Sequence, residues 1–124
     1  MLKAFPLTKV DFSLENSFQE IIPVVFITNR TMLNATSKDI DELVVRVIDY
    51  CAEIDFKEIQ FDCDWNKSSR DRFFEFLSKV KAKMPDVIVS STLRLHQYKY
   101  REDMGVPPVD RVCLMMYHTS DFRK

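Results

Sequence analysis

A single glycine, Gly105, is the feature that most restricts how this chain of 124 residues can fold. Tight β-hairpins favour glycine where the backbone takes a positive φ angle, so a protein built from many hairpins usually contains several glycines. A hairpin-rich all-β fold is therefore disfavoured. Longer connections between strands and helices suit this sequence better.

The spacing of apolar residues predicts strands that alternate with helices. Residues 21–29, IIPVVFITN, form a short, β-branched and nearly continuous apolar run, which is typical of a strand buried on both faces. Residues 37–54 and 67–85 instead place apolar side chains at helical spacing. Period-two patterns over residues 58–66 and 86–98 predict two further strands.

The order of these segments predicts an α/β fold with a parallel sheet. After the strand over residues 86–98, residues 100–110 contain a Pro-Pro pair and predict a loop, and residues 111–121 predict a fourth strand. Such alternation forms βαβ units with right-handed crossovers, and four parallel strands make half of a barrel of about 250 residues. We predict one α/β domain over residues 21–124, a partial (β/α) TIM-like barrel or a small open sheet, after an irregular lead-in over residues 1–20.

Composition and charge exclude several classes of protein. A hydrophobic content of 46% with 30% charged residues is ordinary for a globular domain rather than a disordered chain. With 18 basic and 19 acidic residues, the chain has no excess positive charge to attract nucleic acid or an anionic membrane surface. No apolar run approaches the roughly 20 residues that span a bilayer. We therefore expect no nucleic-acid partner and no transmembrane segment.

The amino-terminal sequence, residues 1–18, lacks the uninterrupted apolar core of a secretory signal peptide. Charged residues and Pro6 interrupt it too early. The compartment is left open, because a longer parent protein could carry an export signal.

The strand predicted over residues 58–66, EIQFDCDWN, has one apolar face and one acidic face. Side chains alternate between the two faces of a strand, so Asp62 and Asp64 point the same way. Parallel α/β folds place their active sites at the carboxyl ends of the strands, where these carboxylates are expected. One interpretation is a catalytic pair in which the charge of one carboxylate keeps the other protonated. The alternative is a structural cluster in the barrel lumen, neutralised by Arg94.

Four more residues are candidates for substrate binding at the same edge. Arg94 and His96 end the polar face of the next predicted strand, so we expect them to line the same cavity as the two aspartates. Trp65 and Tyr117 lie at strand ends, where their rings would stack on a sugar. For each of these aromatic residues, packing in the core is the alternative.

A divalent metal ion held by Asp62, Asp64, His96 and His118 is a further alternative, in which the metal activates water. Neither an HxxxH nor an HxH spacing supports it, so we assign no metal ligand and expect no cofactor. Three scattered cysteines, without a CxxC pair, predict buried free thiols rather than a disulfide framework or a zinc site.

Two segments resemble a known family. EIQFDCDW and TLRLHQYKYREDMGVPPVDRVCLMMYHTSD are similar to bacterial barrel proteins distantly related to the chitinase-like, family-18 type glycoside hydrolases, over about residues 22–121. The segment RLHQYKY…GVPPVDR is the most specific part. In these enzymes one strand carries a D-x-D-x-E signature and a strand two steps on carries M-x-Y. Asp62 and Asp64 resemble the first motif, and Met115 and Tyr117 resemble the second.

The resemblance implies a segment of a larger (β/α)8 barrel that binds or cleaves a carbohydrate, with Asp62 and Asp64 as catalytic carboxylates. The chain departs from the family at the catalytic acid. With one alignment the acid position falls on Asn66, which cannot donate a proton as a carboxylic acid does. With the other, Asp64 takes the acid position and Gln60 and Asp62 precede it. The alternatives are therefore a binding or structural barrel domain that has lost the acid, and a metal-dependent hydrolase.

A partial barrel also leaves the edges of its sheet unpaired. Unpaired strand edges present free backbone donors and acceptors, which pair readily with another chain. We therefore expect this chain to self-associate through open sheet edges, and we expect its parent protein to be longer.

Overall fold

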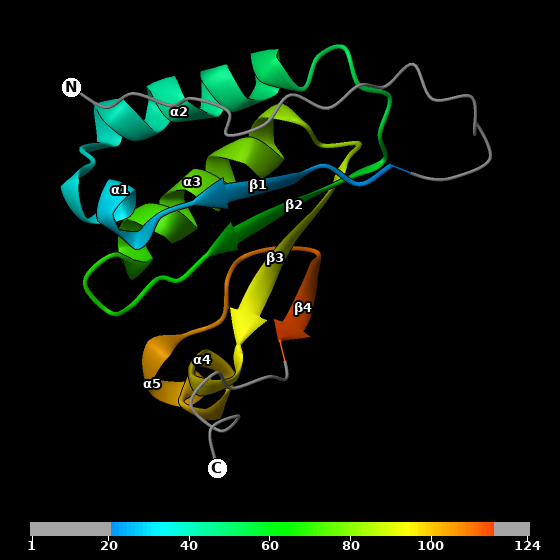
Figure 1. Ribbon diagram of the computed structural model, residues 1–124. Coiled ribbons are helices and arrows are strands. Elements are labelled where there is room, and N and C mark those ends of the chain that lie inside the picture. The colour runs from blue at the N-terminus through cyan, green and yellow to red at the C-terminus, as the bar shows by residue number, and fades with distance from the viewer. Residues whose placement is uncertain (1–20, 116–124) are drawn as a thin grey trace, which may run out of the picture.

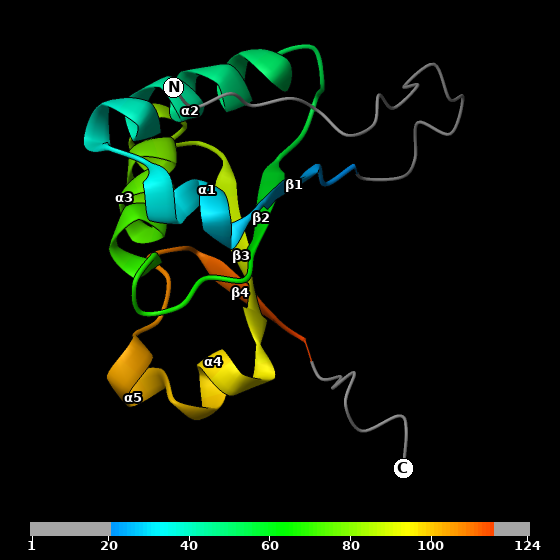
Figure 2. The same ribbon diagram turned by 60° about the vertical axis from the view of Figure 1, so that its left-hand side comes forward.

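A computed structural model of the chain describes residues 21–115, which form one sheet with helices packed against one face (Figures 1 and 2). Its strands are β1 (Val24–Ile27), β2 (Glu58–Cys63), β3 (Ile88–Arg94) and β4 (Arg111–Met115). Its helices are α1 (Asn29–Asn34), α2 (Ser37–Tyr50), α3 (Arg70–Lys83), α4 (Leu95–Lys99) and α5 (Arg101–Met104). Within the described range, no helix is both long and apolar enough to cross a membrane.

The four strands are parallel and lie in the order β1-β2-β3-β4, which is also their order in the chain. The prediction of an α/β fold with four parallel strands is confirmed. Over the described residues the sheet is open rather than closed, which is consistent with part of a barrel. The lead-in predicted for residues 1–20 and the end of the fourth predicted strand, residues 116–121, lie outside the described range.

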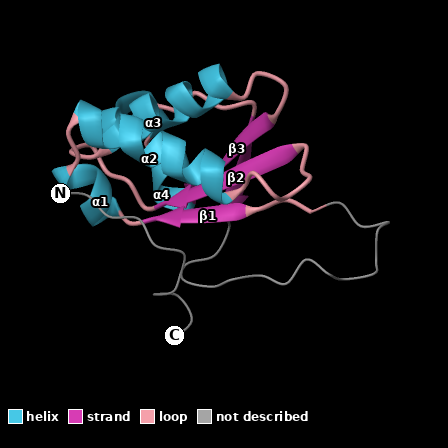
Figure 3. Cartoon of the chain, turned by 90° about the horizontal axis from the view of Figure 1, so that it is seen from above, coloured by secondary structure: helices cyan, strands magenta, loops and turns pink. Residues whose placement is uncertain are grey.

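The core lies between the sheet and helices α2 and α3, which lie side by side over the sheet (Figure 3). Phe61 of β2 contacts Phe76 of α3 edge to face, with ring centroids 5.0 Å apart. Alternation along β2 therefore turns Phe61 and Cys63 toward the helices. Asp62 points to the opposite side of the sheet, which none of the described helices covers and which is called the uncovered face below. Cys51 and Cys63 are buried as predicted, whereas Cys113 is exposed.

Three short helices were missed by the sequence prediction. The strand expected over residues 86–98 ends at Arg94, and the chain continues as α4, so His96 lies on a helix rather than on a strand. The loop expected over residues 100–110 begins with α5, and α1 follows directly after β1. Each of these helices has six residues or fewer, which is too short for a helical period to be visible in the sequence.

Gly105 ends α5 in the one positive-φ conformation of the described chain, with φ of 89°. A side chain at this position would be strained, and its Cβ would also meet the ring of Phe74 at 3.4 Å. Arg70 donates hydrogen bonds to the carbonyl oxygens of Asp103 and Met104, just before the glycine. The single glycine therefore lets the connection from β3 to β4 turn back against α3.

Polar side chains tie α2 to α3 along their exposed sides. Glu75 accepts hydrogen bonds from Arg72 at 2.9 Å and from Lys79 at 2.7 Å, and Lys79 also contacts Asp41 of α2. The hydrogen bond from Lys79 is the main reason that the pKa of Glu75 is lowered from its ordinary value of 4.5. Glu75 is therefore more stable as a carboxylate in the folded protein than in the unfolded chain.

Replacing Glu75 with Gln is expected to lower the free energy of unfolding by about 1 kcal/mol near pH 7. A carboxylate with a lowered pKa stabilises the fold above its unfolded pKa, and this contribution disappears as pH falls through the folded pKa. In urea unfolding measurements, the difference between the Glu75→Gln variant and the parent should therefore shrink as the pH is lowered below 4.5 and through the lowered pKa of Glu75 in the folded protein. Glu53→Gln, at an exposed position outside this cluster, is the control. A difference that stays constant with pH would contradict this role.

Candidate functional site

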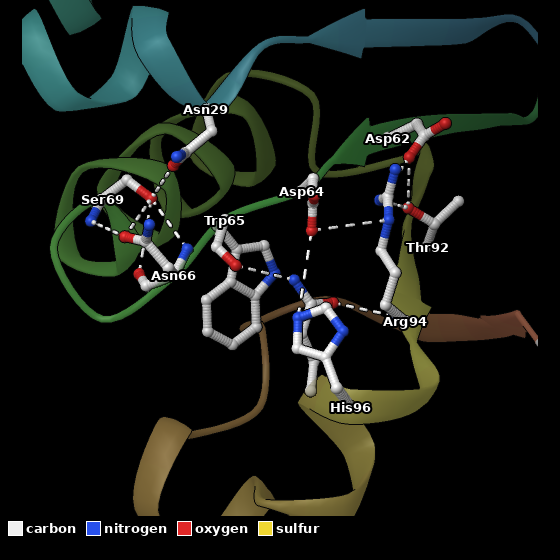
Figure 4. A network of polar contacts seen from close by, with 10 residues as sticks. Asn29, Asp62, Asp64, Trp65, Asn66, Ser69, Thr92, Arg94 and His96 are labelled. Atoms are coloured by element: carbon white, nitrogen blue, oxygen red, sulfur yellow. Dashed lines mark hydrogen bonds and ion pairs between the residues drawn. The ribbon is translucent and has the colours of Figure 1, made fainter. Parts of the chain in front are cut away.

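Asp62, Thr92 and Arg94 meet on the uncovered face of the sheet, at the carboxyl ends of β2 and β3 (Figure 4). Arg94 donates from Nη1 to Asp62 Oδ1 at 2.6 Å, and Thr92 donates from Oγ1 to the same oxygen at 2.8 Å. Arg94 Nη1 also lies 3.2 Å from Thr92 Oγ1. The predicted neutralisation of Asp62 by Arg94 is therefore present in the structure.

This ion pair is shielded from solvent, since the side chains of Asp62 and Arg94 are only 22% and 23% exposed. A charge-assisted hydrogen bond is stronger in such a place than on an open surface. Desolvation of the two charged groups opposes this gain, and the second hydrogen bond from Thr92 helps to offset it. The three side chains together form a fixed polar unit.

Asp64 and His96 extend this unit toward solvent. Asp64 Oδ1 lies 3.8 Å from Arg94 Nε and 4.0 Å from His96 Nε2. The side chains of Asp64 and His96 are 62% and 56% exposed, respectively. The structure therefore brings together four of the six predicted site residues, namely Asp62, Asp64, Arg94 and His96, and leaves two of them open to a ligand.

Gln97, which the sequence prediction did not identify, fixes the geometry of this edge. Its side chain is fully buried and accepts a hydrogen bond from the backbone N–H of Arg94 at 2.8 Å. The same amide donates to the backbone carbonyl of Trp65 at 2.9 Å. Gln97 thus joins the start of α4 to the segment after β2, which holds Asp64 beside Arg94 and His96.

Trp65 belongs to the core, which is the alternative role given to it from the sequence. Its side chain is fully buried and packs edge to face against Phe74 of α3, with ring centroids 5.1 Å apart. Its Nε1 has no hydrogen-bond partner among the described residues. The ring is therefore not available to stack on a sugar in this conformation.

Asn66 shapes the loop between β2 and α3. Its Oδ1 accepts hydrogen bonds from the backbone N–H groups of Ser68 and Ser69 at 2.9 and 3.2 Å. The buried hydroxyl of Ser69 accepts from the backbone N–H of Asn66 and donates to Asn29 Oδ1 at 2.5 Å. The amide that takes the family's acid position in one alignment is therefore engaged in a turn (Figure 4).

Cys63 lies on the opposite face of β2 from Asp62 and is fully buried. Burial raises the pKa of its thiol to about 12, although the positive charge of Arg94 acts in the other direction. A thiol with such a pKa stays protonated at neutral pH, so Cys63 is a packing residue rather than a nucleophile.

The remaining predicted residues lie beyond the described range. Tyr117 and His118 fall within residues 116–124, and so does most of the M-x-Y motif that begins at Met115. Within residues 21–115, no three His, Cys, Asp or Glu side chains gather closely enough to hold a metal ion. The metal alternative depends on His118, whose position is not described.

Thr92 is a further residue of the site that the sequence analysis did not name. Period-two alternation places Thr92 beside Arg94, yet only the parallel register between β2 and β3 brings its hydroxyl to Asp62. Nothing in the sequence marks Gln97 as a site residue. It lies in the first turn of α4 and binds the backbone N–H of Arg94 just before the helix, but in the sequence such a glutamine looks like any exposed polar residue.

The chain was compared with protein-family models, with curated proteins and with solved structures, and none of the three comparisons finds a match.

Replacing Gln97 with Leu is expected to lower the free energy of unfolding by about 2–3 kcal/mol, because it leaves two backbone groups without partners. Urea unfolding monitored by circular dichroism measures this loss. His96→Ala, at the exposed neighbouring position, is the control and should change stability by less than about 0.5 kcal/mol. A Gln97→Leu variant as stable as the parent would show that these bonds do not hold α4 in place.

Proposed function

We propose that the carboxyl edge of β2 and β3 is a carbohydrate-binding site in a glycoside-hydrolase-like barrel segment. One observation carries this proposal. Asp62 is already bound by Arg94 and Thr92, whereas Asp64, beside the same arginine, and His96, beside Asp64, each have more than half of their side-chain surface exposed.

The exposed groups suit the chemistry of sugar hydroxyls. A carboxylate accepts hydrogen bonds, a guanidinium donates them, and a neutral imidazole can do either. Asp64 brings these three kinds of group together, since its Oδ1 lies 3.8 Å from Arg94 Nε and 4.0 Å from His96 Nε2. Adjacent hydroxyl groups of a pyranose are both donors and acceptors, so they complement such a set without requiring a net charge on the ligand.

Binding without cleavage is the form of this proposal that the contacts favour. Glycoside hydrolysis needs a proton donor and a second group that attacks or stabilises the sugar. Asp62 is held as a hydrogen-bond acceptor by Arg94, and the Asn66 amide is engaged in a turn. Asp64 is the carboxyl group left free to act as an acid at this edge, among the residues described. Cleavage with Asp64 as the acid is the second candidate.

The resemblance to chitinase-like barrel proteins selects the first ligands to test. Soluble chitin-derived oligosaccharides should shift the backbone amide resonances of residues 62–66 and 92–97 in ¹⁵N–¹H spectra. Asp64→Asn and His96→Ala should weaken binding about tenfold each, which corresponds to about 1.4 kcal/mol. Asp86→Asn, at the opposite end of β3, is the matched control because it removes an exposed aspartate far from the site. Saturating oligosaccharide without shifts at this edge would exclude the proposed site for these sugars.

An assay for new reducing ends distinguishes cleavage of the oligosaccharide from binding alone, because only hydrolysis of a glycosidic bond produces them. The binding form predicts tight association without turnover, and the cleavage form predicts turnover in the full-length parent that Asp64→Asn abolishes. Turnover that survives Asp64→Asn would remove Asp64 from any catalytic role.

A further inference from the structure

The sheet has an uncovered face and two strand edges that remain unpaired over the described residues. Strand order follows chain order, and α2 and α3 both lie on the same side, as Figures 2 and 3 show. A parallel sheet with all its helices on one face is the architecture of a barrel wall, in which the other face lines the lumen. In a doubly wound sheet, by contrast, the strand order reverses and helices cover both faces.

The charges on the uncovered face are already paired within the sheet. Arg111 of β4 donates to Glu58 of β2 at 2.9 Å, and Arg94 donates to Asp62. The side chain of Glu58 is only 9% exposed. Between these ion pairs lie the small hydroxyls of Ser90 and Thr92, both nearly fully buried. Such a face can be enclosed without leaving an unpaired charge, which is a condition for burying it.

The edge strand β1 carries exposed apolar side chains on this same face. Val24 is 58% exposed and Phe26 is 52% exposed, and their partners in the register are Gln60 and Asp62. No charged residue occurs within Val24–Ile27. Charged residues are a common device that protects strand edges against pairing, and β1 does not use it. At the opposite edge, Val112 of β4 is 45% exposed, although its register partner Ser91 places it on the other face of the sheet.

We propose that two copies of this chain close an eight-stranded parallel barrel in which β4 of each copy pairs with β1 of the other. The four described strands of each copy supply the eight of a closed barrel, and a two-fold axis along the barrel makes the two new strand pairings identical. All eight carboxyl ends then lie at one mouth, so the candidate sites of the two copies share one cavity. This inference rests on the sheet and does not require the proposed function.

A second copy fits this surface better than a docked helix does. A helix packs through an apolar stripe, whereas the uncovered face presents two ion pairs and the polar residues Gln60, Ser90 and Thr92. A helix would also leave the backbone groups of β1 and β4 unpaired at both edges. Four strands from a second copy cover both edges and meet the polar face with another polar face, as in a barrel lumen.

The oligomeric state of the full chain tests this proposal first. Sedimentation velocity should show a discrete species at twice the chain mass of 14.7 kDa. Phe26→Glu should shift it to the monomer with unchanged far-ultraviolet circular dichroism, because the side chain is already half exposed in one copy. Tyr50→Glu is the matched control, since Tyr50 is also 52% exposed but lies at the end of α2, and it should leave the dimer intact.

The native thiol of Cys113 tests which edges meet. Cys113 is exposed on β4 and shares the uncovered face with Val24 and Phe26, because it pairs with Thr92 in the register. Val24→Cys or Phe26→Cys should form an intermolecular disulfide with Cys113 on mild oxidation, giving a covalent dimer that Cys113→Ser abolishes. Val25→Cys, whose side chain lies on the helix-covered face, should form none.

Three results would overturn the proposal. A monomer at all concentrations would show that the edges do not pair between copies. Open-ended oligomers would show that the contacts do not close. A dimer insensitive to Phe26→Glu, with no disulfide from either position on β1, would place its interface elsewhere on the surface.

Discussion

The ion pair between Asp62 and Arg94 is the interaction on which the uncovered face depends. The pattern of β2 turns its large apolar residues toward α3, and this leaves an aspartate on the face that none of the described helices covers. A shielded carboxylate without a partner would be costly there, and Arg94 of the neighbouring strand supplies its counter-charge at 2.6 Å. Thr92 adds a second donor from the same strand. The register between β2 and β3, which the packing of the core fixes, therefore also places Arg94 and Thr92 beside Asp62.

Hydrogen bonds made by the segment after β3 fix the positions of the residues at the carboxyl ends of β2 and β3. Gln97 ties the start of α4 to the chain beyond β2, and Arg70 binds the carbonyl oxygens at the end of α5. Gly105 then allows the backbone to turn back toward β4. These contacts hold the segments that follow β2 and β3, which carry Asp64 and His96. Both side chains are therefore held in place although more than half of their surface is exposed.

Patterns with a clear period were predictable from the sequence, whereas the short helices and the packing of single side chains were not. The alternation of strands and helices predicted four parallel strands, and the parity of Asp62 and Arg94 predicted their meeting. The prediction was wrong beyond Arg94, because Leu93 and Leu95 continue a strand-like alternation into a helix that Gln97 caps. Trp65 follows the same alternation, and whether its ring packs inward depends on Phe74, a residue of another element.

A double-mutant cycle on Asp62 and Arg94 tests this account most directly. The free energies of unfolding of Asp62→Asn, Arg94→Met and the double variant would be measured by urea denaturation. If the pair organises the uncovered face, the double variant should be more stable than the sum of the single losses predicts, by about 1 kcal/mol or more. Losses that add within about 0.3 kcal/mol would contradict the account, because the two side chains would then contribute independently.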